Sequence, residues 1–346
     1  MVNNQDRGES HYEFIYFSNE PPSENPPPGH HRYLPNCVHG TLFLTLQIQT
    51  TLHVSTGTVM MGSDIGKPNI NLIKTMVQND KKLIIQGSSL KGCIRSIYEA
   101  ITNSRVGVKP KKPEEYPNER LPAKSKDKLC PASVAFGASG EKWGWQGLIS
   151  IQDAYCEITD VEVGFIPNLW SPQPDKNKSY YTKKDTREPK KTVGWKFYYN
   201  MTNPINKSEG NGIPIQVAAV KNDEFLTQLR FKNLKPEELG ALLIALGQDD
   251  KYPLILKAGA GKPIGFGSMK IYIDEAEIVQ SQADLKARYT SLFTPKNQLL
   301  TEETLDSFLR NKIDQAYDTN FVDTNKLEQL FKILNPDTKF EPKENY

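Results

Sequence analysis

The sequence predicts an α+β fold whose core is a ferredoxin-like βαββαβ unit, with large insertions and a C-terminal helical extension. Short segments alternate apolar and polar residues as half-buried strands do, and two longer segments have the spacing of helices. In chain order these segments are strand 41–50, helix 87–102, strand 147–158, strand 225–232, helix 235–248 and strand 268–273. That order is the split βαβ arrangement of ferredoxin-like domains.

The first strand follows an N-terminal arm. Residues 1–40 are polar and rich in proline, which indicates an arm or a long loop. Within 41–50, Leu42, Leu44 and Leu46 alternate with mostly polar residues, so one face of the strand should be buried. Residues 52–69 contain three glycines and a proline, and we expect them to form a loop.

The first helix begins where an apolar run ends in Gly-Ser-Ser, residues 87–89. Apolar residues recur at helical spacing over 90–101, and either serine can cap the helix. Lys91 and Arg95 are four residues apart and therefore share one face. Two interpretations are open: a loop with a good N-cap, or a helix terminus arranged to receive a phosphate.

The second half of the chain contains a long insertion and a helical extension. Residues 166–215 are polar but include several aromatic residues, and 176–196 carry eight basic and two acidic residues. Such a stretch suits contact with RNA or with a neighbouring subunit. We place the C-terminal extension at 274–346. Its helical patterns lie at 282–293, 301–317 and 323–334.

The composition is that of a soluble globular protein, with 346 residues, a net charge of +2 and 24% charged residues. No apolar run is long enough to span a membrane and no signal pattern is present, so we expect a cytoplasmic location. The four cysteines form no CxxC pair, which argues against a zinc ribbon or a disulfide framework. A basic body with an acidic end suits a polyanionic partner, although a solvated lysine-rich loop has the same composition.

A glycine-rich segment, KAGAGKPIGFGSMKI, precedes the last strand. It is not a P-loop, because Leu256 stands where the first glycine belongs and Pro263 follows Lys262. It is not a dinucleotide fingerprint either, because Ile264 replaces the third glycine and the segment joins a helix to a strand. Two interpretations remain: a tight turn, or a loop whose amides and lysine approach a phosphate backbone.

Several motifs, in this order, resemble the RAMP superfamily, specifically the backbone-forming subunits of type III CRISPR effector complexes. The motifs are LHVSTG, GSSLKGCIRS, CPASVAFGASGEKWGWQGLISIQDAYCEI and GAGKPIGFGSMKI. The resemblance covers roughly residues 41–273 and implies an RRM-like RNA-binding domain. The insertion and the helical extension depart from the common backbone subunit.

The resemblance implies that the protein holds a guide RNA by its sugar–phosphate backbone, with target RNA and other subunits of the complex as further partners. The RNA-binding residues expected from the two motifs are Ser88, Ser89, Lys91, Arg95, Gly259, Gly261, Lys262 and Gly265. The composition of the insertion adds Lys183, Lys184, Arg187 and Trp195. In this family an acid in the loop after the first strand commonly cleaves target RNA with a metal ion. Here that acid is Asp64, and the ion expected is Mg²⁺.

Three alternatives to this function are a guide-RNA-processing endonuclease, a purely structural subunit and a small-molecule enzyme. A guide-RNA-processing endonuclease of the same superfamily usually relies on a histidine as acid or base, and here every histidine precedes residue 54. A purely structural subunit would bind guide RNA without cutting its target. A small-molecule enzyme on a ferredoxin-like fold has no cofactor or catalytic motif in its favour.

Overall fold

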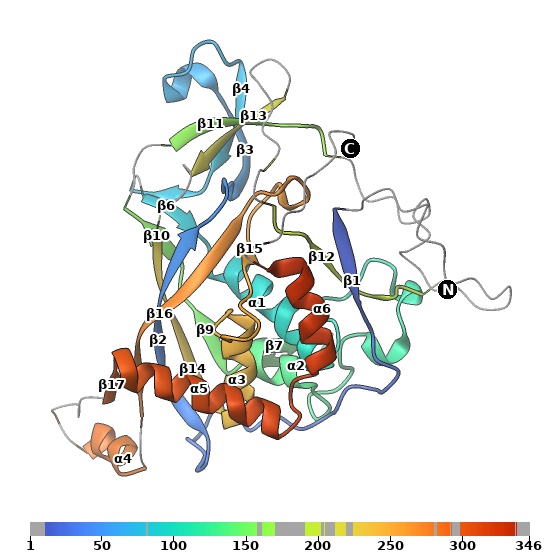
Figure 1. Ribbon diagram of the computed structural model, residues 1–346, viewed down its shortest axis with the longest axis vertical. Coiled ribbons are helices and arrows are strands. Elements are labelled where there is room, and N and C mark those ends of the chain that lie inside the picture. Colours follow the sequence, from blue (N-terminus) through green and yellow to red (C-terminus); the bar gives the residue numbers. More distant parts are fainter. Residues whose placement is uncertain are drawn as a thin grey trace, which may run out of the picture.

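The main element of the structure, a computed structural model, is an antiparallel β-sheet assembled from segments far apart in the chain (Figure 1). The structure describes residues 11–80, 82–157, 161–169, 191–201, 204, 212–218, 224–279, 282–290, 292, 298–335 and 337. Within these residues the sheet has nine strands. Seven of them lie in the order β15 (Leu256–Lys257), β16 (Ser268–Ile278), β2 (Val38–Ile48), β14 (Glu224–Leu234), β10 (Ala154–Cys156), β6 (Lys82–Ile85) and β5 (Gln78–Asn79). The other two are β17 (Gln298–Leu300), which pairs with β16, and β9 (Ile149–Ile151), which pairs with β14.

The predicted alternation of the central strands is confirmed. Leu42, Leu44 and Leu46 of β2 are buried, and the residues between them are half-buried on the other face. β14 alternates in the same way, and its Leu229 lies opposite Leu42 in the register. One face of this sheet therefore carries the hydrophobic core, and the other face is open.

Helices α1 (Gly87–Ile101) and α3 (Pro236–Ala245) cover the buried face of the sheet (Figure 1). The apolar stripe of α1, predicted from its spacing, is buried, with Ile94 and Tyr98 at 1% and 0% exposure. Pro236 lies at the first position of α3 as expected, and the Glu238 carboxylate accepts the Lys235 amide at 2.9 Å. A short helix, α2 (Pro131–Phe136), and a small hairpin, β7 (Gly137–Ser139) with β8 (Gly144–Gln146), pack beside α1.

The C-terminal helices form where the pattern predicts them. They are α4 (Gln282–Thr290), α5 (Glu302–Asp318) and α6 (Thr324–Leu334). α5 packs against α3, and α6 packs against α1, so their buried residues belong to the same core as the sheet. A Cβ atom at Gly240 of α3 would lie 2.0 Å from the Lys312 carbonyl oxygen of α5, so glycine permits this close contact. The hydrophobic core therefore extends beyond residue 273.

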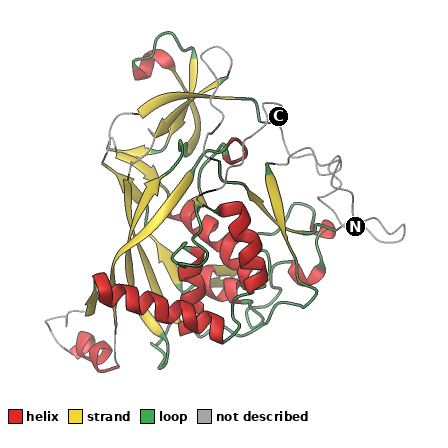
Figure 2. Cartoon of the chain, viewed as in Figure 1, coloured by secondary structure: helices red, strands yellow, loops and turns green. Residues whose placement is uncertain are grey.

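A second, four-stranded sheet projects from the body in the order β11 (Val161–Ile166), β13 (Ile213–Ala218), β4 (Leu72–Met76) and β3 (Ser55–Met61). β3 and β4 form a hairpin, joined through a 3₁₀ turn at Gly62–Ile65 (Figure 2). The expectation of a loop at 52–69 is therefore wrong. Every residue of β3 is exposed, so its sequence lacks the period of two that reveals a half-buried strand.

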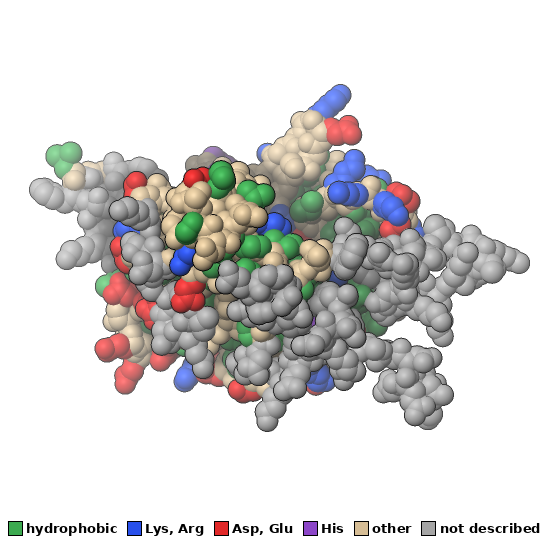
Figure 3. All heavy atoms as spheres, turned by 90° about the horizontal axis from the view of Figure 1, so that it is seen from above, with side chains coloured by type: hydrophobic (Ala, Val, Ile, Leu, Met, Phe, Trp, Pro, Cys, Tyr) green, Lys and Arg blue, Asp and Glu red, His purple; other side chains and the backbone are tan. Residues whose placement is uncertain are grey.

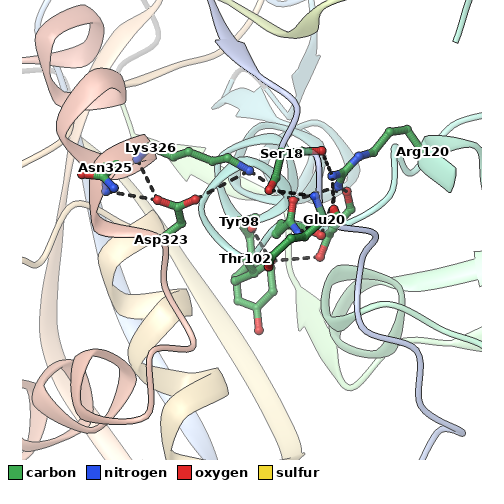
Figure 4. Close-up of polar contacts among 10 residues, drawn as sticks. Ser18, Glu20, Tyr98, Thr102, Arg120, Asp323, Asn325 and Lys326 are labelled. Carbon is green, nitrogen blue, oxygen red and sulfur yellow. Dashed lines mark hydrogen bonds and ion pairs between the residues drawn. The ribbon is translucent and has the colours of Figure 1, made fainter. Parts of the chain in front are cut away.

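The N-terminal arm contains a strand, β1 (Tyr12–Tyr16), that pairs with β12 (Gly194–Tyr198) of the insertion. A buried arginine then ties the arm to the end of α1 (Figure 4). The Arg120 guanidinium donates to the carbonyl oxygens of Ser18 and Glu20, both at 2.7 Å, and to Asn103 Oδ1 at 2.9 Å. Five donors of one side chain can satisfy several carbonyls at once, which makes a buried arginine suitable here. Among the described residues, no helix is long and apolar enough to cross a membrane.

Candidate nucleic-acid interface

The amino end of α1 is capped differently from the prediction. The N-cap residue is Gln86, whose carbonyl oxygen accepts the amides of Ser89 at 2.9 Å and Leu90 at 3.1 Å. The Gly87 amide donates to Asp153 Oδ1 at 2.8 Å. The expectation that Ser88 or Ser89 caps the helix is therefore wrong. The first amides of a helix have no partner within the helix, and here the Asp153 carboxylate, from the loop between β9 and β10, accepts one of them.

Gly87 is required by the packing of this helix start. A Cβ atom at Gly87 would lie 2.3 Å from the carbonyl oxygen of Ile151, the last residue of β9. The backbone of α1 therefore enters directly against the edge of the sheet. This contact fixes where the first turn of the helix lies.

Lys91 and Arg95 are held inside the fold. The Lys91 ammonium donates to the Ile149 carbonyl oxygen at 2.6 Å, and burial, together with the charge of Arg95, lowers its pKa. The Arg95 guanidinium forms an ion pair with Glu99 at 2.6 Å and donates to the Gly137 carbonyl oxygen at 2.9 Å. These contacts attach α1 to β9 and to the small hairpin. Both cations thus have partners in the protein, which the prediction of a shared phosphate-facing surface did not anticipate.

The outward face of α1 consists of small residues. Ser88, Gly92 and Ser96 are exposed, and Ser89 and Cys93 are half-buried. A Cβ atom at Gly92 would have no atom within 4 Å, so the space over this face is open. A polymer backbone can lie close to such a surface. The charges at Lys91 and Arg95 do not reveal this face; its sequence signal is the recurrence of small residues every four positions, at 88, 92 and 96.

The glycine-rich segment packs onto the chain that follows β2. The Ala260 amide donates to the His53 carbonyl oxygen at 2.9 Å, and the Gly267 amide donates to that of Thr51 at 2.8 Å. Gly259 has a φ of +75°, and a Cβ atom there would lie 2.4 Å from the His53 carbonyl oxygen. These glycines are thus required by a tight turn.

The other two glycines of this loop that were predicted to bind RNA are less accessible. Gly261 and Gly265 are buried, with φ angles of +74° and +93°. Lys262 is half-buried and, within the described part of the chain, has no ion pair. Of the predicted residues in this loop, Gly259 and Lys262 remain at the surface.

The loop and α1 meet at one surface. β15, which leads into the loop, packs against α1. Burial raises the pKa of the Cys93 thiol on α1, and the nearby charge of Lys262 opposes that rise. Lys257 lies beneath them with 8% exposure, and its ammonium has no hydrogen-bond partner among the described residues. Burial, followed by the charge of Lys262, lowers the pKa of Lys257 to about 7. The two motifs that were separate in the sequence thus form one site.

Asp64 lies apart, at the tip of the β3–β4 hairpin. Its side chain is exposed in the 3₁₀ turn and accepts a long hydrogen bond from Ser63 Oγ at 3.4 Å. Hydrophobic side chains are exposed on this end of the molecule, which Figure 3 views from above; they include Met60, Met61 and Leu72 of the hairpin. In the described part of the chain, no group of three or more His, Cys, Asp or Glu side chains could hold a metal ion.

The insertion residues divide into two sets. Trp195 in β12 is only 7% exposed and packs edge-on against Phe17 at 4.6 Å between ring centroids. The ammonium of Lys326 lies 5.4 Å from its ring centroid. The expectation that Trp195 stacks on RNA is wrong, because pairing of β12 with the arm places this side chain in the core. Lys183, Lys184 and Arg187 lie outside the described residues.

Comparison with known protein families shows the family to which this chain belongs. The sequence model of the RAMP superfamily matches residues 45–270. The chain belongs to the RAMP superfamily. No curated protein matches it. The RAMP match includes α1, the β3–β4 hairpin and the glycine-rich loop, so every part of the site described above lies within the family region.

Membership of the RAMP superfamily indicates a CRISPR-associated RNA-binding subunit, with RNA and other members of a complex as partners. The arm with β1 and the helices α4, α5 and α6 lie outside the matched region. β1, α5 and α6 nevertheless pack into the same core. This RAMP protein therefore has a family domain enlarged by its own terminal elements.

Proposed function

We propose that this RAMP protein is a subunit of a type III CRISPR RNA-guided effector complex and holds the guide RNA by its backbone. The observation that carries the proposal is the packing of β15, which leads into the glycine loop, against α1, with the charge of Lys262 near enough to act on Cys93 of that helix. The strand order β16, β2, β14, β10, with α1 and α3 on one face, supports the assignment of a ferredoxin-like core.

The surface suits a sugar–phosphate backbone rather than bases. Ser88 presents a hydroxyl donor, and Gly92 leaves room for close approach. The Ser96 hydroxyl donates to the Gly92 carbonyl oxygen at 3.0 Å, which leaves its oxygen as an acceptor. Lys262 supplies a positive charge beside them. Such contacts read no sequence. In RNA-guided complexes base pairing between guide and target reads the sequence, and the protein holds the backbone.

Lys91 and Arg95 take a different part in this proposal from the one first expected. Their contacts to Ile149, Glu99 and Gly137 hold α1 in position. In this proposal Lys91 and Arg95 fix the position of α1 against β9 and the β7–β8 hairpin, and the small residues of α1 face the RNA. Lys183, Lys184 and Arg187 of the insertion remain predicted RNA contacts.

Target cleavage by Asp64 is a further part of the proposal. Its exposed carboxylate at the tip of a projecting hairpin is accessible to an RNA strand. The residues around it do not fit a complete Mg²⁺ site, because one carboxylate is too few ligands for that ion. Asp64 would supply one ligand, and RNA phosphates would have to supply others. If Asp64 is not required, the subunit is purely structural.

The test of guide binding is a salt titration of Lys262→Gln. We expect weaker binding of guide RNA for every guide sequence. The slope of log affinity against log salt concentration should fall in magnitude by about one, because one phosphate contact is lost. The matched control is Lys111→Gln, an exposed lysine in the loop between α1 and α2. Equal salt slopes for the two variants, or a loss limited to one guide sequence, would contradict the proposal.

A further inference from the structure

A second basic surface lies on the open face of the main sheet, opposite α1 and α3. Two adjoining hollows of about 670 and 620 Å³ share His30, Tyr33 and Lys232 in their walls. Arg230 of β14 also lines the first hollow, and Arg32 of the arm lines the second. We call this surface the arm groove; it is formed by His30, Arg32, Tyr33, Arg230, Lys232 and Lys286. It lies towards the start of β2, at the lower end of the sheet in Figure 1.

The arm groove is positively charged. Arg32, Arg230 and Lys286 are exposed, and none of them forms an ion pair among the described residues. Glu277 is the acidic residue in the walls of the two hollows. It lies two strands away from Arg230, with Thr41 between them in the register. The Cα atoms of Arg230 and Glu277 are therefore roughly 10 Å apart, and among the described residues no ion pair joins their side chains. The cations of the groove are therefore available to a polyanion.

A flat aromatic surface lies beside these charges. The His30 ring stacks on Trp145, with 4.5 Å between ring centroids and an interplanar angle of 18°. His30 Nε2 is 2.6 Å from the Gln146 carbonyl oxygen, which fixes the orientation of the ring. Trp145 is buried, whereas His30 is exposed. The outer face of the imidazole thus resembles a stacking platform for a base.

The arm is held in place around this platform. The Lys232 ammonium donates to the His30 carbonyl oxygen at 2.9 Å and lies 4.4 Å from the centroid of the Tyr33 ring. The Asn233 side chain donates to the Arg32 carbonyl oxygen at 2.9 Å and accepts the Leu34 amide at the same distance. The groove is therefore built from the fold and does not depend on a free chain end.

We propose that the arm groove binds a single strand of RNA, with phosphates at Arg32, Arg230 and Lys286 and a base stacked on His30. This inference rests on the proposed function for the class of ligand, but it assigns a site distinct from α1 and the glycine loop. Unpaired RNA is the ligand that uses both the cations and the exposed ring. An acidic protein surface would use the cations alone.

Binding of a labelled oligouridylate to the full chain tests the groove. The variant combines Arg32→Gln, Arg230→Gln and Lys286→Gln. Its control combines Lys109→Gln, Lys111→Gln and Lys142→Gln, which removes the same charge from exposed positions elsewhere. We expect the groove variant to bind about tenfold more weakly and the control to stay within about twofold of the unmodified chain. Equal affinities for the two variants would overturn the proposal.

The stacking contact has its own test. We expect His30→Ala to weaken oligouridylate binding about fivefold or more, and His30→Phe to restore it, because phenylalanine also offers an aromatic face. Failure of His30→Phe to bind better than His30→Ala would overturn the role of the ring. If the groove variants bind RNA normally but lose a partner subunit during purification, the groove is a protein interface and the RNA assignment is wrong.

Photo-crosslinking separates this proposal from the proposed function. Oligouridylate carrying 4-thiouridine is irradiated with the protein, and the attached peptides are mapped. Crosslinks at His30 or Tyr33 support the groove. Crosslinks confined to α1 and the glycine loop would overturn the groove and leave the proposed function standing. Crosslinks at the groove without any at α1 or the loop would support the groove and count against the guide-binding surface.

Discussion

At the scale of single residues, buried and half-buried cations hold together the segments around the proposed guide-binding surface. Lys91, Arg95 and Arg120 each donate to backbone carbonyl oxygens of distant segments. Lys257 differs from them, because its ammonium is buried and has no partner among the described residues. Burial lowers its pKa to about 7, from an ordinary value of 10.5. It is the residue in this site whose charge changes most readily near neutral pH.

Lys257 makes the free energy of unfolding depend on pH in a defined direction. Between pH 7 and 10.5 the unfolded chain keeps the proton that the folded chain releases, so stability rises with pH and is lost as pH falls towards 7. Replacing Lys257 by methionine removes this dependence. From pH 7 to 9 the unmodified chain should gain about 2 kcal/mol relative to Lys257→Met. Urea unfolding at both pH values measures the difference, and parallel pH curves would show that Lys257 is not held neutral.

At the scale of elements, the contact between α3 and α5 joins the C-terminal helices to the family domain. Gly240 makes the contact possible, because a Cβ atom there would lie 2.0 Å from the Lys312 carbonyl oxygen. Gly240→Ala should therefore destabilise the fold by about 1–3 kcal/mol despite the better helix propensity of alanine. Thermal unfolding checks this against Gly92→Ala, which has open space on α1 and should not destabilise. Equal stability of the two variants would mean that α5 can shift from α3 without lowering the free energy of unfolding, and would contradict this prediction.

The β3–β4 hairpin carries the prediction about cleavage. Asp64→Asn should abolish a target-RNA cut in the assembled complex while guide and target binding stay intact, because the side chain is exposed and, among the described residues, makes a single long hydrogen bond. The assay compares cleavage ladders of labelled target with and without Mg²⁺. Ser63→Ala, next to it in the same turn, is the control for local structure. A ladder that Asp64→Asn does not change would make this a binding subunit without cleavage activity.

Elements with one buried face could be predicted from the sequence, and those without one could not. β2, β14 and α1 show the periods of two and 3.6 because burial selects apolar residues on a single face. The β3–β4 hairpin was missed because β3 is exposed throughout. The environment of Trp195 depends on pairing between β12 and β1, which are far apart in the chain. The directions of Lys91 and Arg95 depend likewise on carbonyl oxygens of other segments.

At the scale of the whole molecule, the chain is a mixed α/β protein with antiparallel sheets, and six α-helices occur in its described part. The family match spans 45–270, and β1 of the arm and helices α5 and α6 pack into the same core. The proposed guide-binding surface lies where α1 meets the glycine loop, and the hairpin with Asp64 projects from the other sheet (Figure 1). In the proposed arrangement the guide RNA lies on the core of the family domain, and the hairpin stays accessible to a second strand.

The central claim, that guide RNA lies over the small-residue face of α1, is tested most directly by Gly92→Glu. The position has open space around it, so the fold should be unaffected or slightly stabilised, as thermal unfolding can verify. The added negative charge should repel phosphates. We expect guide RNA to bind about tenfold more weakly or worse for every guide sequence, whereas Gly92→Lys keeps or improves affinity. Unchanged guide binding by a folded Gly92→Glu protein would contradict the claim.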